Sequence, residues 1–212
     1  MPTMDTDLSS ASASFVGEGV NDWSGYSVAG AGDVNGDGFE DVLIGAPNND
    51  DGGADAGKTY LFLGMASGWS IRWDLSKANG SFVGENAYDH SGISVAGAGD
   101  VNGDGLDDIL IGADRNDDGG SDAGKTYLIL GRRTGWTSDV DLSRANATFI
   151  GEDQDDNAGQ AVAGAGDVDG DGYDDILIGA PGVHQGSIWR GKTYLIAGMA
   201  TGWKVDTDLS RY

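Results

Sequence analysis

The positions of the apolar residues along the chain predict short strands and almost no helix. Residues 41–46 form a continuous apolar run, which is typical of a strand that is covered on both faces. Residues 58–64 are rich in strand-forming side chains, and residues 27–33 mix valine and alanine with glycine, so both favour strands. Residues 14–17 supply a shorter fourth strand. The helical period is weak throughout, and only residues 74–78 and their equivalents fit one turn of helix.

This set of strands occurs three times along the chain. The segment Phe-Val-Gly-Glu at residues 15–18 recurs at 82–85 and, with isoleucine as its second residue, at 149–152. The segment Gly-Lys-Thr-Tyr-Leu recurs at the same interval of 67 residues. A period of this length indicates a solenoid, a propeller or an array. Four strands per repeat, each covered on both faces, favour blades that are stacked around an axis.

The sequence therefore predicts an all-β protein, a β-propeller of three four-stranded antiparallel blades. We expect a single domain over residues 1–212. Its repeats are expected at approximately residues 14–80, 81–147 and 148–212, and its N-terminal segment is expected to act as a closing strand. The 38 glycines of the chain suit turns and tightly packed strands, and they argue against long helices.

Each repeat carries an acidic loop of nine residues between two of these strands. In the first repeat, positions 1, 3, 5 and 9 of the loop are Asp33, Asn35, Asp37 and Asp41, and position 7 is Phe39. Alternate side chains of a tightly curled loop converge, the carbonyl of position 7 joins them, and glycine at position 6 permits the bend. Oxygen ligands without cysteine or histidine favour Ca²⁺ over zinc and copper, and Mg²⁺ would retain its waters.

The three loops have the same register, so the sequence predicts three calcium ions per chain. The predicted ligands are Asp33, Asn35, Asp37, Phe39 and Asp41 in the first loop, Asp100, Asn102, Asp104, Leu106 and Asp108 in the second, and Asp167, Asp169, Asp171, Tyr173 and Asp175 in the third. An EF-hand is excluded, because it needs glutamate at position 12, where this chain has isoleucine. The alternative of plain polar turns does not explain three loops in one register without lysine or arginine.

The charge of the chain also points to cations as partners. It has 35 acidic residues against 12 lysines and arginines, and its net charge is −23, which argues against nucleic acid and anionic membranes. There is no cysteine, which excludes disulfides and thiolate chemistry. No apolar run approaches the roughly 18 residues that a membrane span requires, so we expect no membrane insertion.

Two short segments and their spacing resemble a known repeat. Ile-Gly-Ala-Pro at residues 44–47 and again at 178–181 follows an acidic loop, and Gly-Lys-Thr-Tyr-Leu follows later. Together they resemble the FG-GAP repeat, the unit of the integrin α-subunit β-propeller, over nearly the whole chain. The second repeat departs from this pattern with Asp114 in place of proline, and the Phe-Gly of the repeat is Ser-Gly or Ala-Gly here. The resemblance implies calcium at the intact acidic loops, but no motif matches the family's ligand binding.

Other residues offer candidate ligand contacts. Trp69, Trp136 and Trp203 recur after the third strand of each repeat, either as packed anchors of a hairpin or as sugar-stacking platforms. The third repeat replaces an acidic segment with a loop that contains His184, Trp189 and Arg190. This loop is a ligand contact, a docking surface for protein or glycan, or neutral drift.

Three blades are too few to close a ring, since propellers have about four to eight. Residues 5–9 recur as residues 206–210, so the chain begins and ends at the same phase of its repeat. The last repeat lacks a following Ser-Phe-Val-Gly strand, and the N-terminus carries a spare one. We therefore expect a homodimer in which each copy gives its first strand to the last blade of the other, forming a six-bladed C2 ring. The rivals are a piece of a longer propeller and an engineered repeat protein.

The sequence favours a non-enzymatic module with a structural, assembly or surface-recognition role, in which Ca²⁺ rigidifies each blade. The two histidines, His90 and His184, lie in non-equivalent loops, and no nucleophile elbow or phosphate-binding glycine motif is present. The alternatives are a lectin-like or other ligand-binding module, and an accessory domain of a larger secreted protein. We expect an extracellular or cell-surface location, where calcium is near millimolar, with the export signal outside this sequence.

Overall fold

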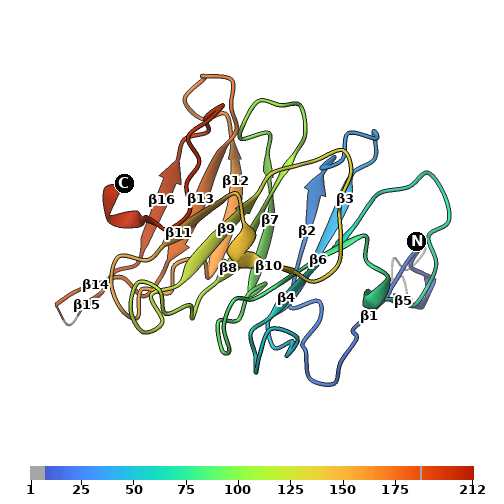
Figure 1. The fold of residues 1–212 in the computed structure, drawn as a ribbon, viewed down its shortest axis with the longest axis horizontal. Helices are drawn as coiled ribbons and strands as arrows, with labels where there is room; N and C mark the ends of the chain where they lie inside the picture. The colour runs from blue at the N-terminus through green and yellow to red at the C-terminus, as the bar shows by residue number, and fades with distance from the viewer. Residues whose placement is uncertain (1–7, 187) are drawn as a thin grey trace, which may run out of the picture.

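Three antiparallel sheets stand face to face in a row (Figure 1). The structure, a computed structural model, describes residues 8–186 and 188–212. Within these residues the only helices are four 3₁₀ turns, and none of them is long and apolar enough to cross a membrane. The N-terminal strands lie at one end of the row and the C-terminal turn lies at the other.

The first sheet combines strands from two repeats. Its order is β10-β6-β4-β3-β2. The strands are β2 (Ser27–Gly32), β3 (Asp41–Ala46), β4 (Lys58–Phe62), β6 (Gly80–Val83) and β10 (Val140–Asp141). β6 belongs to the second repeat and pairs antiparallel with β4, while β10 pairs parallel with β6. The sheets therefore cross the boundaries of the sequence repeats.

The second sheet has the same order, β17-β11-β9-β8-β7. It contains β7 (Ser94–Gly99), β8 (Asp108–Ala113), β9 (Lys125–Ile129), β11 (Ala147–Ile150) and β17 (Thr207–Asp208). β11 comes from the third repeat and completes the sheet of the second. In both sheets the inner strand is small-residue, as expected, and a bulge near its end leads into the acidic loop.

The third sheet is shorter. It contains β12 (Ala161–Gly166), β13 (Asp175–Ala180) and β16 (Lys192–Ile196). A separate hairpin follows β13 and is made of β14 (His184–Gln185) and β15 (Ile188–Trp189). No strand pairs with the outer edge of β16 within the residues that the structure describes.

The prediction of three four-stranded blades is therefore wrong in two respects. The third sheet has three strands, because the strand that completes a sheet comes from the following repeat. The first two sheets each have a fifth, parallel strand of two residues, which was too short to leave a pattern in the sequence. The all-β class and the positions of the inner strands are as predicted.

The N-terminal strand lies at the far end of the first sheet. β1 (Phe15–Val16) pairs parallel with β5 (Trp73–Asp74), as β6 pairs with β10. The 3₁₀ turn η1 (Leu8–Ser10) precedes it. The predicted helical turn is present as η2 (Leu75–Lys77), with the Asp74 side chain accepting a hydrogen bond from Ser76 N. Of the recurring N-terminal segment, residues 5–7 lie outside the described residues.

The equivalent turns of the later repeats are η3 (Leu142–Arg144) and η4 (Leu209–Arg211). Two main cores lie between neighbouring sheets. Leu43 and Leu61 of the first sheet pack with the apolar face of the second, and Leu110 of the second packs with the third. A smaller core on the outer face of the first sheet includes Tyr60. Strands β3 and β8 are thus covered on both faces, as predicted.

Candidate cation sites and buried lysine clusters

The backbone of each acidic loop needs two glycines. In the first loop, Gly36 at position 4 has φ 72° and Gly38 at position 6 has φ 90°, and the other two loops repeat this conformation. Glycine adopts left-handed φ without steric cost, whereas other residues seldom do. Sequence reasoning had assigned a role only to position 6. The two turns curl the loop so that its acidic side chains face inward.

The carboxylate at position 1 is held by the backbone of its own loop. Asp33 Oδ1 accepts a hydrogen bond from Gly36 N at 2.7 Å, and its Oδ2 accepts one from Gly38 N at 2.8 Å. Asp167 accepts the same pair of bonds in the third loop. Burial acts to raise the pKa of Asp33, but these amide bonds outweigh it and hold the pKa below its usual value.

The carboxylate at position 9 is buried and ties the loop to the sheet. Asp41 accepts a hydrogen bond from Val34 N at 3.0 Å and another from Gly64 N, beyond the end of β4, at 2.6 Å. Burial raises the pKa of Asp41 to about 6 and that of Asp108 to about 7. The nearby negative charges of positions 1 and 5 raise both pKa values further. A cation at this place would relieve that repulsion.

The oxygens of the third loop lie close enough together to hold one ion. Asp167, Asp169 and Asp175 each offer a carboxylate oxygen, and these atoms lie within 4.8 Å of one another. In the first two loops an asparagine occupies position 3, and its oxygen has the same orientation. Asn35 Oδ1 accepts from the position-5 amide at 2.8 Å, and Asp169 Oδ1 does so at 3.1 Å. These donor sets fit a hard divalent cation.

Positions 5 and 7 of each loop are linked to each other. The position-5 carboxylates, Asp37, Asp104 and Asp171, each accept a hydrogen bond from the position-7 amide at 3.0 Å. The position-7 side chains point elsewhere. Leu106 lies against Gly36 of the preceding loop, and Tyr173 lies against the equivalent glycine of the second loop. The position-7 residue thus joins neighbouring loops through its side chain.

The acid at position 8 has a role that sequence reasoning missed. Asp107 Oδ2 accepts a hydrogen bond from Asp33 N at 2.7 Å, and Asp174 Oδ2 accepts one from Asp100 N at 2.9 Å. Each acid therefore connects the cation loop of one sheet to that of the next. The available signal was an acidic residue at position 8 of all three loops, with Glu40 in the first.

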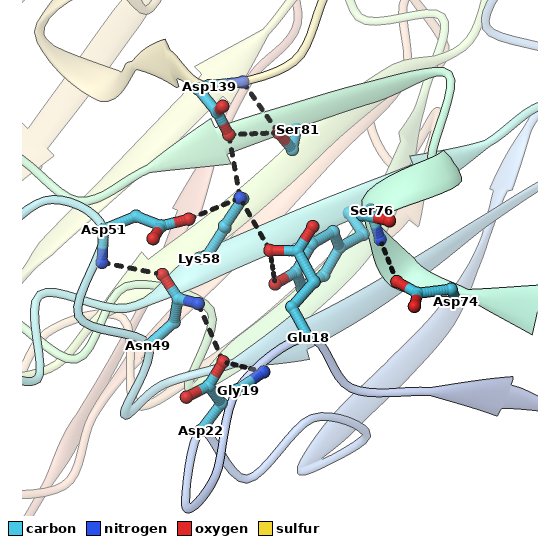
Figure 2. Close-up of polar contacts among 11 residues, drawn as sticks. Glu18, Gly19, Asp22, Asn49, Asp51, Lys58, Asp74, Ser76, Ser81 and Asp139 are labelled. Carbon is cyan, nitrogen blue, oxygen red and sulfur yellow. Dashed lines mark hydrogen bonds and ion pairs between the residues drawn. The ribbon is translucent and has the colours of Figure 1, made fainter.

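A buried lysine joins the first two sheets. Lys58 Nζ lies 2.6 Å from Asp51 Oδ2, 2.8 Å from Asp139 Oδ1 and 3.1 Å from Glu18 Oε2 (Figure 2). Asp139 comes from the segment before β10, where Ser81 also contacts it. Burial acts to lower the pKa of Lys58, but the three carboxylates outweigh it and raise the pKa above its usual value. The lysine therefore remains charged.

The same cluster recurs once, and it is incomplete in the third sheet. Lys125 Nζ contacts Asp118 at 2.7 Å, Glu85 at 2.9 Å and Asp206 at 3.4 Å. Lys192 pairs only with Glu152 among the described residues. Its side chain is 40% exposed, against 3% for Lys125. Sequence reasoning missed these clusters, although a lysine repeated within an apolar strand was the signal.

The candidate ligand loop of the third repeat forms a protruding hairpin. His184 pairs with Trp189, their ring centroids are 5.6 Å apart, and Trp189 is exposed. The backbone amide of Arg190 donates to Val183 O at 2.9 Å. The structure thus brings His184 and Trp189 together, while Arg190 lines a pocket with Lys192 at the edge of β16.

The repeated tryptophans are packed rather than fully exposed. Trp136 lies edge-on to Phe82 at a centroid distance of 6.3 Å, and Trp203 lies in the same way on Phe149. Trp69 contacts Phe15 similarly. Each tryptophan therefore anchors the hairpin to an aromatic residue of the outer strand, which favours the packed-anchor interpretation over the sugar-stacking one.

Sheets with this strand order, an acidic loop after each inner strand and a fixed repeat define the blades of a β-propeller, one sheet to a blade. A family model described as "FG-GAP repeat" matches residues 24–62, 91–129 and 158–189. The chain belongs to the FG-GAP repeat family.

Curated relatives include several integrin α subunits. Integrin alpha-V of Gallus gallus is 33% identical over 184 residues, which are 84% of this chain and 17% of that protein. Integrin alpha pat-2 of Caenorhabditis elegans is 32% identical over 196 residues, 86% of this chain and 14% of that protein. Integrin alpha-IIb of Homo sapiens is 32% identical over 179 residues, 82% of this chain and 16% of that protein. The chain therefore spans only a small part of the length of these relatives.

Proposed function

We propose that this chain is a non-enzymatic calcium-binding β-propeller module that binds three Ca²⁺ ions, one in each acidic loop. The supporting observation is the geometry of the loops, in which inward carboxylates surround a buried aspartate and no basic residue is present. An ion there would neutralise the carboxylates and fix the loop to the end of the third strand, so its binding energy would add to the stability of the fold. Its role would be structural, in assembly or in surface recognition.

The number of ions is the direct test of this proposal. Calorimetric titration of the metal-free chain should give three Ca²⁺ per chain, and Asp104→Ala should reduce this number to two. Asp153→Ala is the matched control, because Asp153 is an exposed acid outside the loops, and it should leave three. Fewer than three ions in the unmodified chain, or an equal loss in both variants, would contradict the proposal.

We also propose that the module works outside the cell or at its surface. Extracellular calcium is near millimolar, which suits sites of modest affinity, and the relatives named as integrin α subunits support this setting. The small share of those relatives that the chain spans leaves an accessory role in a larger protein as part of the proposal.

A lectin-like role is the second candidate, favoured by the exposed Trp189 beside His184 on the protruding hairpin. Aromatic faces stack on sugars, and the hairpin differs from the corresponding segments of the other repeats. Binding on a glycan array that is lost in Trp189→Ala, and retained in Tyr88→Ala, would support this role. Absence of glycan binding by the unmodified chain would remove it.

For assembly, we propose a homodimer that forms a six-bladed ring. The third sheet has an open outer edge, and β1 lies at the opposite end of the row without a sheet of its own to complete. Light scattering should give a mass of twice 21.7 kDa. The mass of a single chain would contradict the proposal.

A further inference from the structure

We propose that the two ends of the row of sheets bind each other between copies in one defined register. In this arrangement Phe15 and Val16 of one copy extend the third sheet of the other, antiparallel to β16. Val16 lies opposite Lys192, and Phe15 lies opposite Thr193. This inference rests on the proposed homodimer and specifies which residues of the second copy complete each ring contact.

The outer face of the third sheet is apolar and exposed. Val168 is 57% exposed, whereas the equivalent Val34 and Val101 are fully buried against the following sheet. Leu195 is 47% exposed, whereas the equivalent Leu61 and Leu128 are fully buried. The third sheet therefore has a face of the kind that the first two sheets cover with a neighbouring sheet.

The opposite end of the row carries the complementary surface. Val28 of β2 is 66% exposed, whereas the equivalent Val95 is 7% exposed because it packs against the preceding sheet. Phe39 is 42% exposed, whereas Leu106, at the same loop position, is 6% exposed. Large exposed apolar side chains gather at both ends of the row, and in the second repeat Tyr88 alone is among those identified in the described residues. Exposed apolar surface of this extent marks an interaction site.

The pairing inside the molecule fixes the register between copies. Phe82 lies opposite Thr59 in the first sheet, and Phe149 lies opposite Thr126 in the second. Applying the repeat of 67 residues once more places Thr193 opposite Phe15. The residues of β4 and β9 are all buried, whereas Lys192, Thr193 and Leu195 of β16 are exposed. A strand edge with free backbone groups favours the addition of another strand.

A pocket marks the place where the adjoining loop would dock. It has a volume of about 410 Å³ and includes Gly179 and Gly191 in its walls. In the first sheet the equivalent Gly57 forms a bridge with Ser91 of the next repeat, and in the second Gly124 bridges to Ala158. Gly191 is next in this series, and Ser24 of a second copy is its partner by the same repeat.

A second copy is the occupant because this one chain carries both halves of the contact. The ends continue an interface that the molecule already builds twice, between the first and second sheets and between the second and third. Two copies joined head to tail by this contact use both ends of each row. The ring is then closed and leaves no free sheet edge.

The contact between copies differs from the internal contacts at two positions. Ser27 and Ser94 donate side-chain hydrogen bonds to the carbonyls of Gly92 and Gly159, whereas alanine occupies the equivalent position 161. The contact between copies therefore lacks this hydrogen bond.

The second difference is a reversal of charge. Asp139 and Asp206 reach back to the lysines of the preceding sheet, but Arg72 stands at their position in the first repeat. Its amide donates to Ser14 Oγ at 2.7 Å, as the amide of Asp139 donates to Ser81 Oγ. In the proposed register Arg72 faces Lys192 of the other copy. The contact between copies is therefore weaker than the internal contacts.

An engineered disulfide tests the register, because the chain has no cysteine of its own. Gly80 and Ala147 lie opposite Leu61 and Leu128, so Ala13 should lie opposite Leu195 of the other copy. Mild oxidation of the variant with Ala13→Cys and Leu195→Cys should give a covalent dimer in high yield. The control pairs Ala13→Cys with Tyr88→Cys, an exposed position in the second repeat, and should stay largely uncrosslinked.

A dimer of twice the chain mass that fails to crosslink, or that crosslinks equally in the control, would overturn the register while leaving the homodimer intact. A single-chain mass would overturn both. Arg72→Asp provides a second measurement that requires no disulfide, since it restores the lysine–aspartate pair of the internal contacts. It should lower the dimer dissociation constant by on the order of tenfold, because two contacts per ring gain the pair. An unchanged constant would also overturn the register.

Discussion

The melting temperature of the protein should fall by about 15–30 °C when calcium is removed with a chelator. A site that is filled at about 100 times its dissociation constant contributes about 2.7 kcal/mol, and three sites contribute about 8 kcal/mol. For a chain of this length, each kcal/mol changes the melting temperature by about 2–4 °C. Differential scanning calorimetry with 1 mM free Ca²⁺ (a chosen concentration of about that size) and with excess EGTA measures the difference.

The physical reason for so large an effect is the position-9 aspartate. Asp41 and Asp108 are buried beside two further carboxylates, so without an ion their charges destabilise the folded state. Asp104→Ala should reduce the calcium-dependent increase by about a third, whereas the exposed Asp153→Ala should leave it unchanged. Melting that is identical with and without chelator would contradict a stabilising role for calcium.

Strands and loops that repeat along the chain were predictable because each depends on local pattern. β3 is a continuous apolar run, and its bounds agree with the predicted residues 41–46. The acidic loops were predictable because alternate oxygens at fixed positions converge in any tightly curled backbone. Three copies of the pattern in one register made chance improbable for both features. The convergence of Asp167, Asp169 and Asp175 agrees with that expectation.

Features that depend on pairing between repeats were not predictable in the same way. A strand such as β6 has the same pattern whether it completes its own sheet or the preceding one, so the sequence alone did not exclude four strands in the third blade. Lys58 meets Asp139 across two sheets, and nothing local links these residues. Gln160 and Asp114, whose side chains meet between the third and second repeats, illustrate the same limit.

The lysine clusters give the second large expected effect, and the repeat provides its own control. Lys125→Met should lower the free energy of unfolding by about 3 kcal/mol, because it leaves Glu85 and its neighbouring carboxylates without their cation. This figure is at the lower end of the range for a broken buried pair, since Asp118 and Asp206 are partly exposed and remain hydrated. Urea unfolding at fixed calcium measures the loss.

Lys192→Met is the matched variant, because the same change is made in the same Gly-Lys-Thr-Tyr-Leu segment. Lys192 has one acidic partner among the described residues and a side chain that is 40% exposed, so its loss should cost less than about 1 kcal/mol. Equal losses in the two variants would mean that the three-carboxylate arrangement adds nothing beyond the packing of the lysine stem. A larger loss for Lys125→Met would instead locate the difference in the carboxylates that the neighbouring sheets bring to it, because the local sequence is the same at both lysines.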